Sequence, residues 1–151
     1  MARPIEGGAR ASEERRDVQI LAIILIILHV LPGVYWAGST MVLAANGGIG
    51  AETVYPRQMG AATMVLVAGL ILWWLFHWGE PGRREYVLAA GAVAAIAAGA
   101  VQGMIVGPAR RSLIASDGAD GAARARAAMG YRMSAGLLAL AVACMVSAQY
   151  V

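Results

Sequence analysis

Long apolar runs joined by polar links make up most of the chain. The four runs cover residues 18–45, 58–78, 86–107 and 128–150. Each is close to or longer than the ~20 residues that an α-helix needs to cross a bilayer. Because short links make successive helices run antiparallel, the pattern predicts an all-α membrane protein, a four-transmembrane-helix antiparallel bundle. We expect a polar N-terminal leader over residues 1–17 and a single transmembrane domain over residues 18–151.

The composition supports a membrane protein. Of the 151 residues, 60% are hydrophobic and 14% are charged, and the mean hydropathy is +0.65, which excludes an ordinary soluble domain. All 12 basic residues are arginines, and the predicted spans divide them between both membrane faces, so nucleic-acid binding is not expected. The single cysteine, Cys144, cannot form an intrachain disulfide. The sequence contains no P-loop and no Ser/His/Asp set.

Only the arginines next to the first span indicate how the protein is oriented in the membrane. Arg15 and Arg16 directly precede it, and the first helix usually dominates orientation. An even number of spans puts both ends of the chain on one side. We therefore expect a multi-pass protein of the inner (cytoplasmic) membrane with both termini in the cytoplasm. The first apolar run is about twice as long as the apolar region of a signal peptide, so we expect it to remain as an uncleaved span.

The third apolar run carries small residues at every fourth position. These are Gly91, Ala95, Gly99, Gly103 and Gly107. Such a stripe lets another backbone approach closely, which is how helices associate in lipid. The neighbour is either the first span or a second copy of the chain, and we expect a homodimer or a subunit of a membrane complex.

The first apolar run contains a histidine near the middle of the membrane. Eleven residues precede His29 in the run, and only Gln19 among them is polar, which places His29 about 16 Å deep at ~1.5 Å per residue. An ionisable residue at that depth is a functional candidate. The alternative is an imidazole bonded to a neighbouring polar group; the candidate partners are Ser39, Thr40, Ser134 and Gln102.

The residues around His29 favour a ligand or a close helix. At helical spacing, His29, Gly33, Ala37 and Thr40 share one face, with Trp36 beside it. The small side chains leave room for a flat group or for another backbone. Pro32 cannot donate to the carbonyl of Leu28, so a kink is expected there.

A second histidine closes the second apolar run. His77 shares a helix face with Gly69 and Trp73. Together, His29 and His77 suggest a haem held by two imidazoles. The predicted depths of His29 and His77 differ by ~12 to 15 Å. Two axial nitrogens must lie within about 4 Å of each other through an iron, so a single haem bridging both in one chain is disfavoured. The alternative is an interfacial His77 within an aromatic belt.

A family resemblance rests on residues of the first half. His29 is followed by Trp36 and Gly38 as W-x-G, Arg57 opens the second span and Gly69 lies late in it. Over residues 20–78 this resembles a superfamily of small helical membrane proteins. It includes HemJ-type protoporphyrinogen oxidases, CopD-type copper-resistance proteins and the membrane portion of PuuD-type urate oxidases. The resemblance implies b-type haem at the position of His29.

The second half departs from the HemJ pattern. That pattern has a lysine on the third span and an Asn-Glu pair at the start of the fourth, whereas this chain has no lysine and reads Tyr131-Arg132-Met133-Ser134 there. The resemblance therefore does not extend to protoporphyrinogen oxidation. The histidines and scattered methionines also lack the clustering that a copper site needs.

Arginines near the third link are candidates for binding an anion. Arg110 and Arg111 follow the third span, on the same predicted face as Arg57. Guanidinium groups suit haem propionates, a porphyrin substrate or lipid phosphate, although ordinary interfacial anchoring is the alternative for each of them. A second axial ligand could come from a second copy's His29, from Met64 or from Met104, or the position could stay open. The predicted cofactor-binding set is His29, Gly33, Trp36, Arg57, His77, Met104, Arg110 and Arg111, with His29 as the metal ligand.

Two functions therefore stand as hypotheses. The first is a membrane haem b protein that takes part in electron transfer or porphyrin-related redox chemistry. The second is a cofactor-free accessory or structural subunit that docks to a larger membrane complex through the glycines of the third span.

Overall fold

The computed structural model describes the backbone of residues 5–77 and 82–151 and the side chains of residues 13–77 and 82–151. Its elements are α1 (Ile5–Ala45), α2 (Ala51–Phe76), α3 (Arg83–Val101), the π-helical turn η1 (Gln102–Val106), α4 (Gly107–Ala115), α5 (Gly121–Ser147) and the 3₁₀ turn η2 (Ala148–Tyr150). Four helical stretches are long and apolar enough to cross a membrane: Glu13–Ala45, Ala51–Phe76, Arg83–Ala115 and Gly121–Tyr150. The predicted all-α, four-span fold is confirmed.

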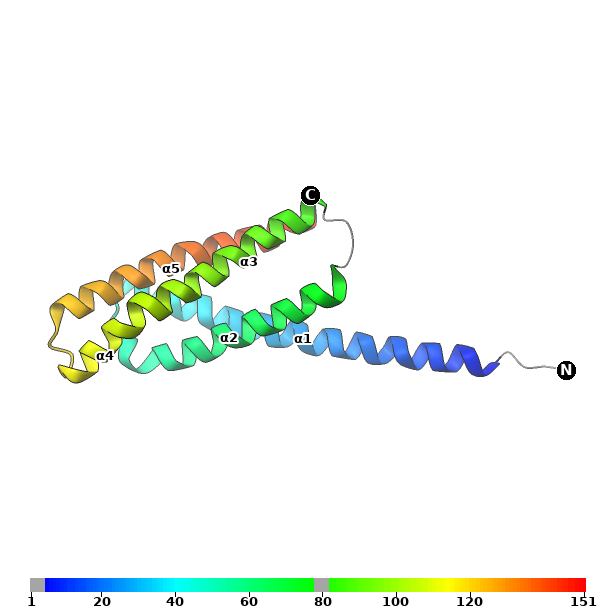
Figure 1. Ribbon diagram of the computed structural model, residues 1–151, viewed down its shortest axis with the longest axis horizontal. Helices are drawn as coiled ribbons and strands as arrows, with labels where there is room; N and C mark the ends of the chain where they lie inside the picture. The colour runs from blue at the N-terminus through cyan, green and yellow to red at the C-terminus, as the bar shows by residue number, and fades with distance from the viewer. Residues whose placement is uncertain (1–4, 78–81) are drawn as a thin grey trace.

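All four spanning helices begin earlier than predicted, including α3 at Arg83 and α5 at Gly121. α1 begins at Ile5, so the described part of the leader continues the first span as one helix that extends beyond the bundle (Figure 1). The same helix runs through Pro32 without a break. α2 begins at Ala51, and Pro56, which the sequence placed in a link, lies inside it. A proline near the start of a helix removes only one helical hydrogen bond, so it does not end the helix.

The bundle consists of two pairs of helices. α1 packs along α2 and α3 packs along α5, α1 also contacts α5, and α2 and α3 have few contacts with each other. The pairs meet at the end where α4 lies and separate toward the opposite end (Figure 1). The core therefore lies where the pairs meet, and the separated ends leave space between α2 and α3.

The glycine stripe of the third span makes contacts within the chain at most of its positions. A Cβ on Gly91 would lie 3.0 Å from Cys144 Cβ of α5, and one on Gly99 would lie 3.9 Å from the Trp36 ring of α1. A Cβ on Gly107 would lie 2.8 Å from the Tyr55 hydroxyl of α2. Gly103 is exposed and has no such neighbour within 4 Å.

Gly103 leaves the packed face because a repeat of four does not match the α-helix. With 3.6 residues per turn, each step of four drifts about 40° around the helix, so Gly103 lies about 120° from Gly91. The π-helical turn follows, and in it the N–H of Gly107 donates to the carbonyl of Gln102, five residues earlier. Pro108 comes next and has no N–H to donate to Met104. The wide turn adds one residue and rotates the later positions back, and Gly107 is buried.

Candidate functional site

His29 is held against the neighbouring helix by a hydrogen bond to its backbone. The imidazole is half-buried, and its Nδ1 lies 2.9 Å from the carbonyl oxygen of Val65 in α2. A carbonyl can only accept, so Nδ1 carries the proton and donates it. In the neutral ring, Nε2 then keeps its lone pair. The polar side chains that the sequence offered as partners of His29 are not the ones used, because the partner is a main-chain carbonyl.

Glycine 69 makes this approach possible. A Cβ at Gly69 would lie 2.8 Å from Cε1 and 3.1 Å from Nδ1 of His29. One side of the His29 ring therefore rests on the backbone of α2. A Cβ at Gly33 would lie 3.6 Å from a methyl group of Val65. Of the two uses predicted for the small residues beside His29, the structure shows the close helix.

A buried network of polar side chains joins all four membrane-spanning stretches, which we call crossings. The Trp36 indole N–H donates to Gln102 Oε1 at 2.9 Å, and Gln102 Nε2 donates to Thr40 Oγ1 at 2.9 Å. Gln58 Nε2 donates to Ser39 Oγ at 3.0 Å and to Thr40 Oγ1 at 3.3 Å, and the Tyr131 hydroxyl donates to Gln58 Oε1 at 3.0 Å. Buried polar groups of a membrane span need such partners, because the bilayer core offers no water.

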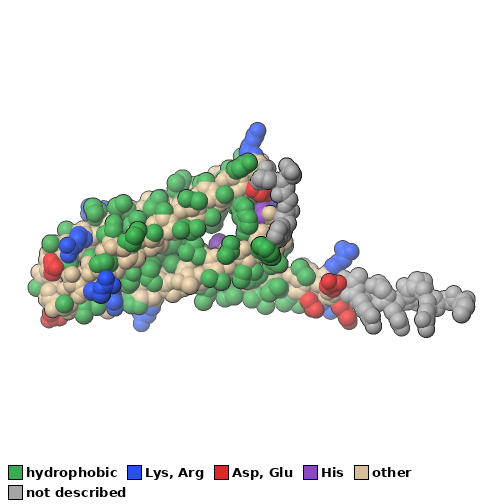
Figure 2. All heavy atoms as spheres, in the orientation of Figure 1, with side chains coloured by type: hydrophobic (Ala, Val, Ile, Leu, Met, Phe, Trp, Pro, Cys, Tyr) green, Lys and Arg blue, Asp and Glu red, His purple; other side chains and the backbone are tan. Residues whose placement is uncertain are grey.

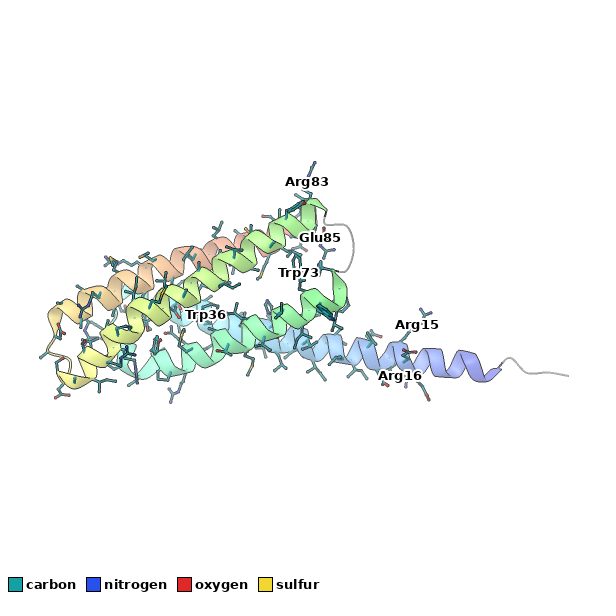
Figure 3. All side chains as sticks on the ribbon, viewed as in Figure 1. Arg15, Arg16, Trp36, Trp73, Arg83 and Glu85 are labelled. Carbon is teal, nitrogen blue, oxygen red and sulfur yellow. The ribbon has the colours of Figure 1, made fainter. Side chains whose placement is uncertain are left out.

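The network assigns Trp36 a role in packing. Its side chain is only 1% exposed, and it extends from α1 to the start of η1 on the third crossing (Figure 3). The sequence placed Trp36 beside a cofactor, whereas the structure places its indole N–H on Gln102. Gln102 is fully buried and begins the π-helical turn. Neither the partner of Gln102 nor the π-helical turn could be predicted from the spacing of residues.

His77 lies at the end of α2 and faces the space between the helix pairs. Its ring stacks on Trp73 with the centroids 5.0 Å apart and the planes 20° from parallel. Its Nδ1 is shielded and has no hydrogen-bond partner in the part of the chain that the structure describes. Figure 2 shows an opening between the helix pairs with histidine side chains along it.

The two histidines lie at different depths. His29 is level with Gly69, and His77 follows Gly69 by two helical turns, about 12 Å along the axis at ~1.5 Å per residue. One iron needs both axial nitrogens within about 4 Å of each other. The structure therefore agrees with the sequence in separating His77 from a ligand held by His29.

Arg110 of the expected anion patch and Arg124, near the start of α5, are both engaged inside the chain. Arg110 Nε donates to the carbonyl of Glu52 at 2.9 Å, and its guanidinium lies 5.8 Å from the centre of the Tyr55 ring. Pro56 has no N–H for that carbonyl, so Arg110 supplies the hydrogen bond that the helix lacks. Arg124 forms a 2.7 Å ion pair with the Glu52 carboxylate.

The other predicted residues lie on the surface. Arg57 and Arg111 are exposed, and Met104 is 71% exposed, so it faces lipid. Among the described residues, no group of three or more His, Cys, Asp or Glu side chains could hold a bare metal ion. Met64 is also an exposed side chain. Of the predicted set, the structure brings His29 and Gly33 together at α2 and does not bring Met104, Arg57 or Arg111 to them.

Comparison with known proteins adds no relative. No family model, no curated protein and no solved structure matches the chain. Function is therefore inferred from the geometry of His29 and of the opening.

Proposed function

We propose that this membrane protein binds haem b through Nε2 of His29 and takes part in electron transfer within the membrane. The observation that carries the proposal is the hydrogen bond from Nδ1 to the Val65 carbonyl. Histidines that ligate metals almost always donate their other ring nitrogen in this way, because the bond fixes the tautomer and orients the ring. A histidine bonded in this way presents the nitrogen that an iron requires.

The donor set fits haem better than it fits a bare metal ion. The porphyrin supplies four nitrogens of its own, so the protein needs to add only one or two axial ligands. The described part of the chain has one such residue at the correct depth, His29, and lacks a cluster of three metal-binding side chains. When bound, haem supplies reversible one-electron chemistry. The hydrogen bond from Nδ1 to the Val65 carbonyl would hold the ring, and with it Nε2, in place.

The structure changes the ligand set that the sequence proposed. His29 remains as the metal ligand, and Gly69 joins it as the residue that lets the imidazole reach Val65. Arg110 is withdrawn from the anion patch because it bonds the Glu52 carbonyl. Met104 is withdrawn because it faces lipid. We leave the second axial position to a second copy's His29 or to an incoming ligand.

The test compares optical spectra of the full chain and two variants. Wild type, His29→Ala and His77→Ala are expressed with added haem precursor and purified in detergent, and reduced-minus-oxidised spectra are recorded. We expect a b-type spectrum in wild type and in His77→Ala and its loss in His29→Ala. Thermal unfolding of each variant separates loss of haem from loss of fold. A spectrum that survives in His29→Ala contradicts the assignment, and its absence from wild type favours an accessory subunit without a cofactor.

A further inference from the structure

The two ends of the bundle differ in charge. At the end where α4 lies, residues 46–57 and 107–132 hold six arginines and three acidic residues. Figure 2 shows arginine side chains, in blue, spread over this end. At the opposite end, residues 13–17 and 82–86 hold four arginines and four acidic residues. The side chains of the α4 end therefore carry a net positive charge, and those of the described residues at the other end balance.

Most arginines of the α4 end have no partner in the described part of the chain. Arg110 and Arg124 are engaged with Glu52, as described above. The other four arginines of this end are exposed and make no hydrogen bond or ion pair with a described residue; they are Arg57, Arg111, Arg126 and Arg132. We call them the outer arginines.

Two of the outer arginines lie deeper in the bundle than the link between α1 and α2. A Cβ at Gly48 in that link would lie 3.1 Å from the backbone nitrogen of Ala128, so the link is level with Ala128 of α5. Arg132 follows Ala128 by four residues, about 6 Å along the helix. Arg57 follows the start of α2 at Ala51 by six residues, about 9 Å. Both positions lie on helices apolar enough to cross a membrane.

The surface around Arg132 is apolar. Met129 and Met133 lie on the same helix, three residues before and one residue after it, and are 52% and 46% exposed. Exposed methionines on a membrane-spanning helix face lipid. A long arginine side chain among them extends its guanidinium toward the membrane surface, where lipid phosphate groups lie.

We propose that the outer arginines bind the phosphate groups of anionic phospholipids around the α4 end. A guanidinium donates two parallel hydrogen bonds to phosphate oxygens, which supplies the partner that the described chain does not. Zwitterionic lipids also carry a phosphate, but their net charge is zero. Because basic side chains near the membrane surface attract negative lipid, the net positive charge of this end favours an anionic headgroup.

The lipid proposal does not rest on haem. Arg57 precedes Gly69, which is level with His29, by twelve residues, about 18 Å along α2. The outer arginine nearest to His29 in sequence is therefore well separated from a ligand on His29. Protein expressed without added haem precursor serves for the test.

The test measures which lipids surround the full chain in phosphatidylcholine vesicles. Spin-labelled phosphatidylglycerol and spin-labelled phosphatidylcholine with the same acyl chains are the probes. In each electron paramagnetic resonance spectrum, the motionally restricted fraction gives the relative association of that lipid with the protein. Arg57→Gln/Arg132→Gln removes two outer arginines, and Arg111→Gln/Arg126→Gln removes the other two. Arg15→Gln/Arg16→Gln is the matched control, because it removes the same charge at the balanced end.

We expect wild type to prefer phosphatidylglycerol over phosphatidylcholine and the preference to weaken as salt is added. Each pair of outer substitutions should lower the preference by about twofold or more, and the control should leave it nearly unchanged. Thermal unfolding identifies a variant that does not fold, and the other pair then decides. Equal association of the two lipids with wild type overturns the proposal. So does a preference that falls as much in the control as in the outer variants, or that stays unchanged in folded outer variants.

Discussion

At the scale of single residues, main-chain carbonyls determine what the charged and titratable side chains do. His29 donates to the carbonyl of Val65, and Arg110 donates to the carbonyl of Glu52, which Pro56 leaves without a helical donor. Neither contact depends on a side chain of the partner. A sequence shows which side chains exist, but it does not show which carbonyls lie opposite them.

Arg110 provides a direct test of this point. Arg110→Leu leaves the Glu52 carbonyl without a partner, which costs about 1–3 kcal/mol of stability. Arg111→Leu is the matched control, since Arg111 is exposed and surface changes usually stay within about 0.5 kcal/mol. Thermal or denaturant unfolding in detergent measures both. Equal unfolding midpoints for the two variants would show that Arg110 is only an interfacial anchor.

Gly69 is expected to be essential for the position of His29. In Gly69→Ala the added Cβ would lie 2.8 Å from His29 Cε1, so the ring or the helix must move, at a cost of about 1–3 kcal/mol. Gly60→Ala on the same helix is the control, because no such neighbour lies within 4 Å. It should be neutral or stabilising by up to about 1 kcal/mol. Loss of haem in Gly69→Ala but not in Gly60→Ala would tie this contact to ligation.

At the scale of elements, the third crossing gains a second neighbour at its π-helical turn. It packs on α5 both before and after η1, and after η1 it also meets α2 at Gly107 and Arg110. Gln102 begins the turn and holds it to α1 through Trp36 and Thr40. Buried hydrogen bonds inside a bundle are worth about 0.6 kcal/mol on average and rarely more than about 2 kcal/mol.

The bond between Trp36 and Gln102 predicts a coupling between these two positions. Trp36→Phe and Gln102→Leu each remove one partner, and the double variant removes both. Because a single variant leaves a buried group unpaired, the double variant should be more stable than the sum of the two losses predicts, by about 0.5–2 kcal/mol. Unfolding of all four proteins in one detergent gives the coupling energy. Strictly additive losses would exclude this hydrogen bond.

Apolar length was enough to predict the elements, but it could not predict how their faces meet. The four spans follow from runs of apolar residues, and the structure confirms them. The start of α1 at Ile5 was missed because a charged segment can continue a helix once lipid has fixed its apolar part. The exposed position of Gly103 was missed because a repeat of four drifts around a helix of 3.6 residues per turn. For the candidate site, the sequence predicted His29 and its depth. It could not predict Val65 as the partner, because any residue can supply a main-chain carbonyl.

At the scale of the whole molecule, two helix pairs joined at one end leave the other end open. The end where α4 lies is closed by the ion pair of Arg124 with Glu52 and by its donation to the carbonyl of Gly48. At the opposite end Trp73 lies on the side of α2 that faces α3 (Figure 3), and the His77 ring stacks on it. Arg15 and Arg16 precede the first span, and from them the sequence predicts a cytoplasmic N-terminal side.

Cysteine labelling tests this orientation. In a Cys144→Ala background, Ala119→Cys in the link before α5 should react in intact cells with a maleimide that does not cross membranes. Glu14→Cys on α1 should react only after the cells are opened, because three crossings, an odd number, put it on the other side of the membrane from residue 119. The reverse labelling pattern would show that the protein has the opposite orientation. Labelling of both cysteines in intact cells would contradict the four-span topology.

The unbroken course of α1 gives the molecule a mechanical property. Glu13 precedes His29 by sixteen residues of continuous helix, about 24 Å at ~1.5 Å per residue. The bundle first holds this rod at Leu25, which is buried one turn before His29. The free part from Glu13 to Leu25 is about 18 Å long, so a tilt of about 5° moves its outer end by about 1.5 Å. The same tilt would turn α1 next to the hydrogen bond between His29 and Val65.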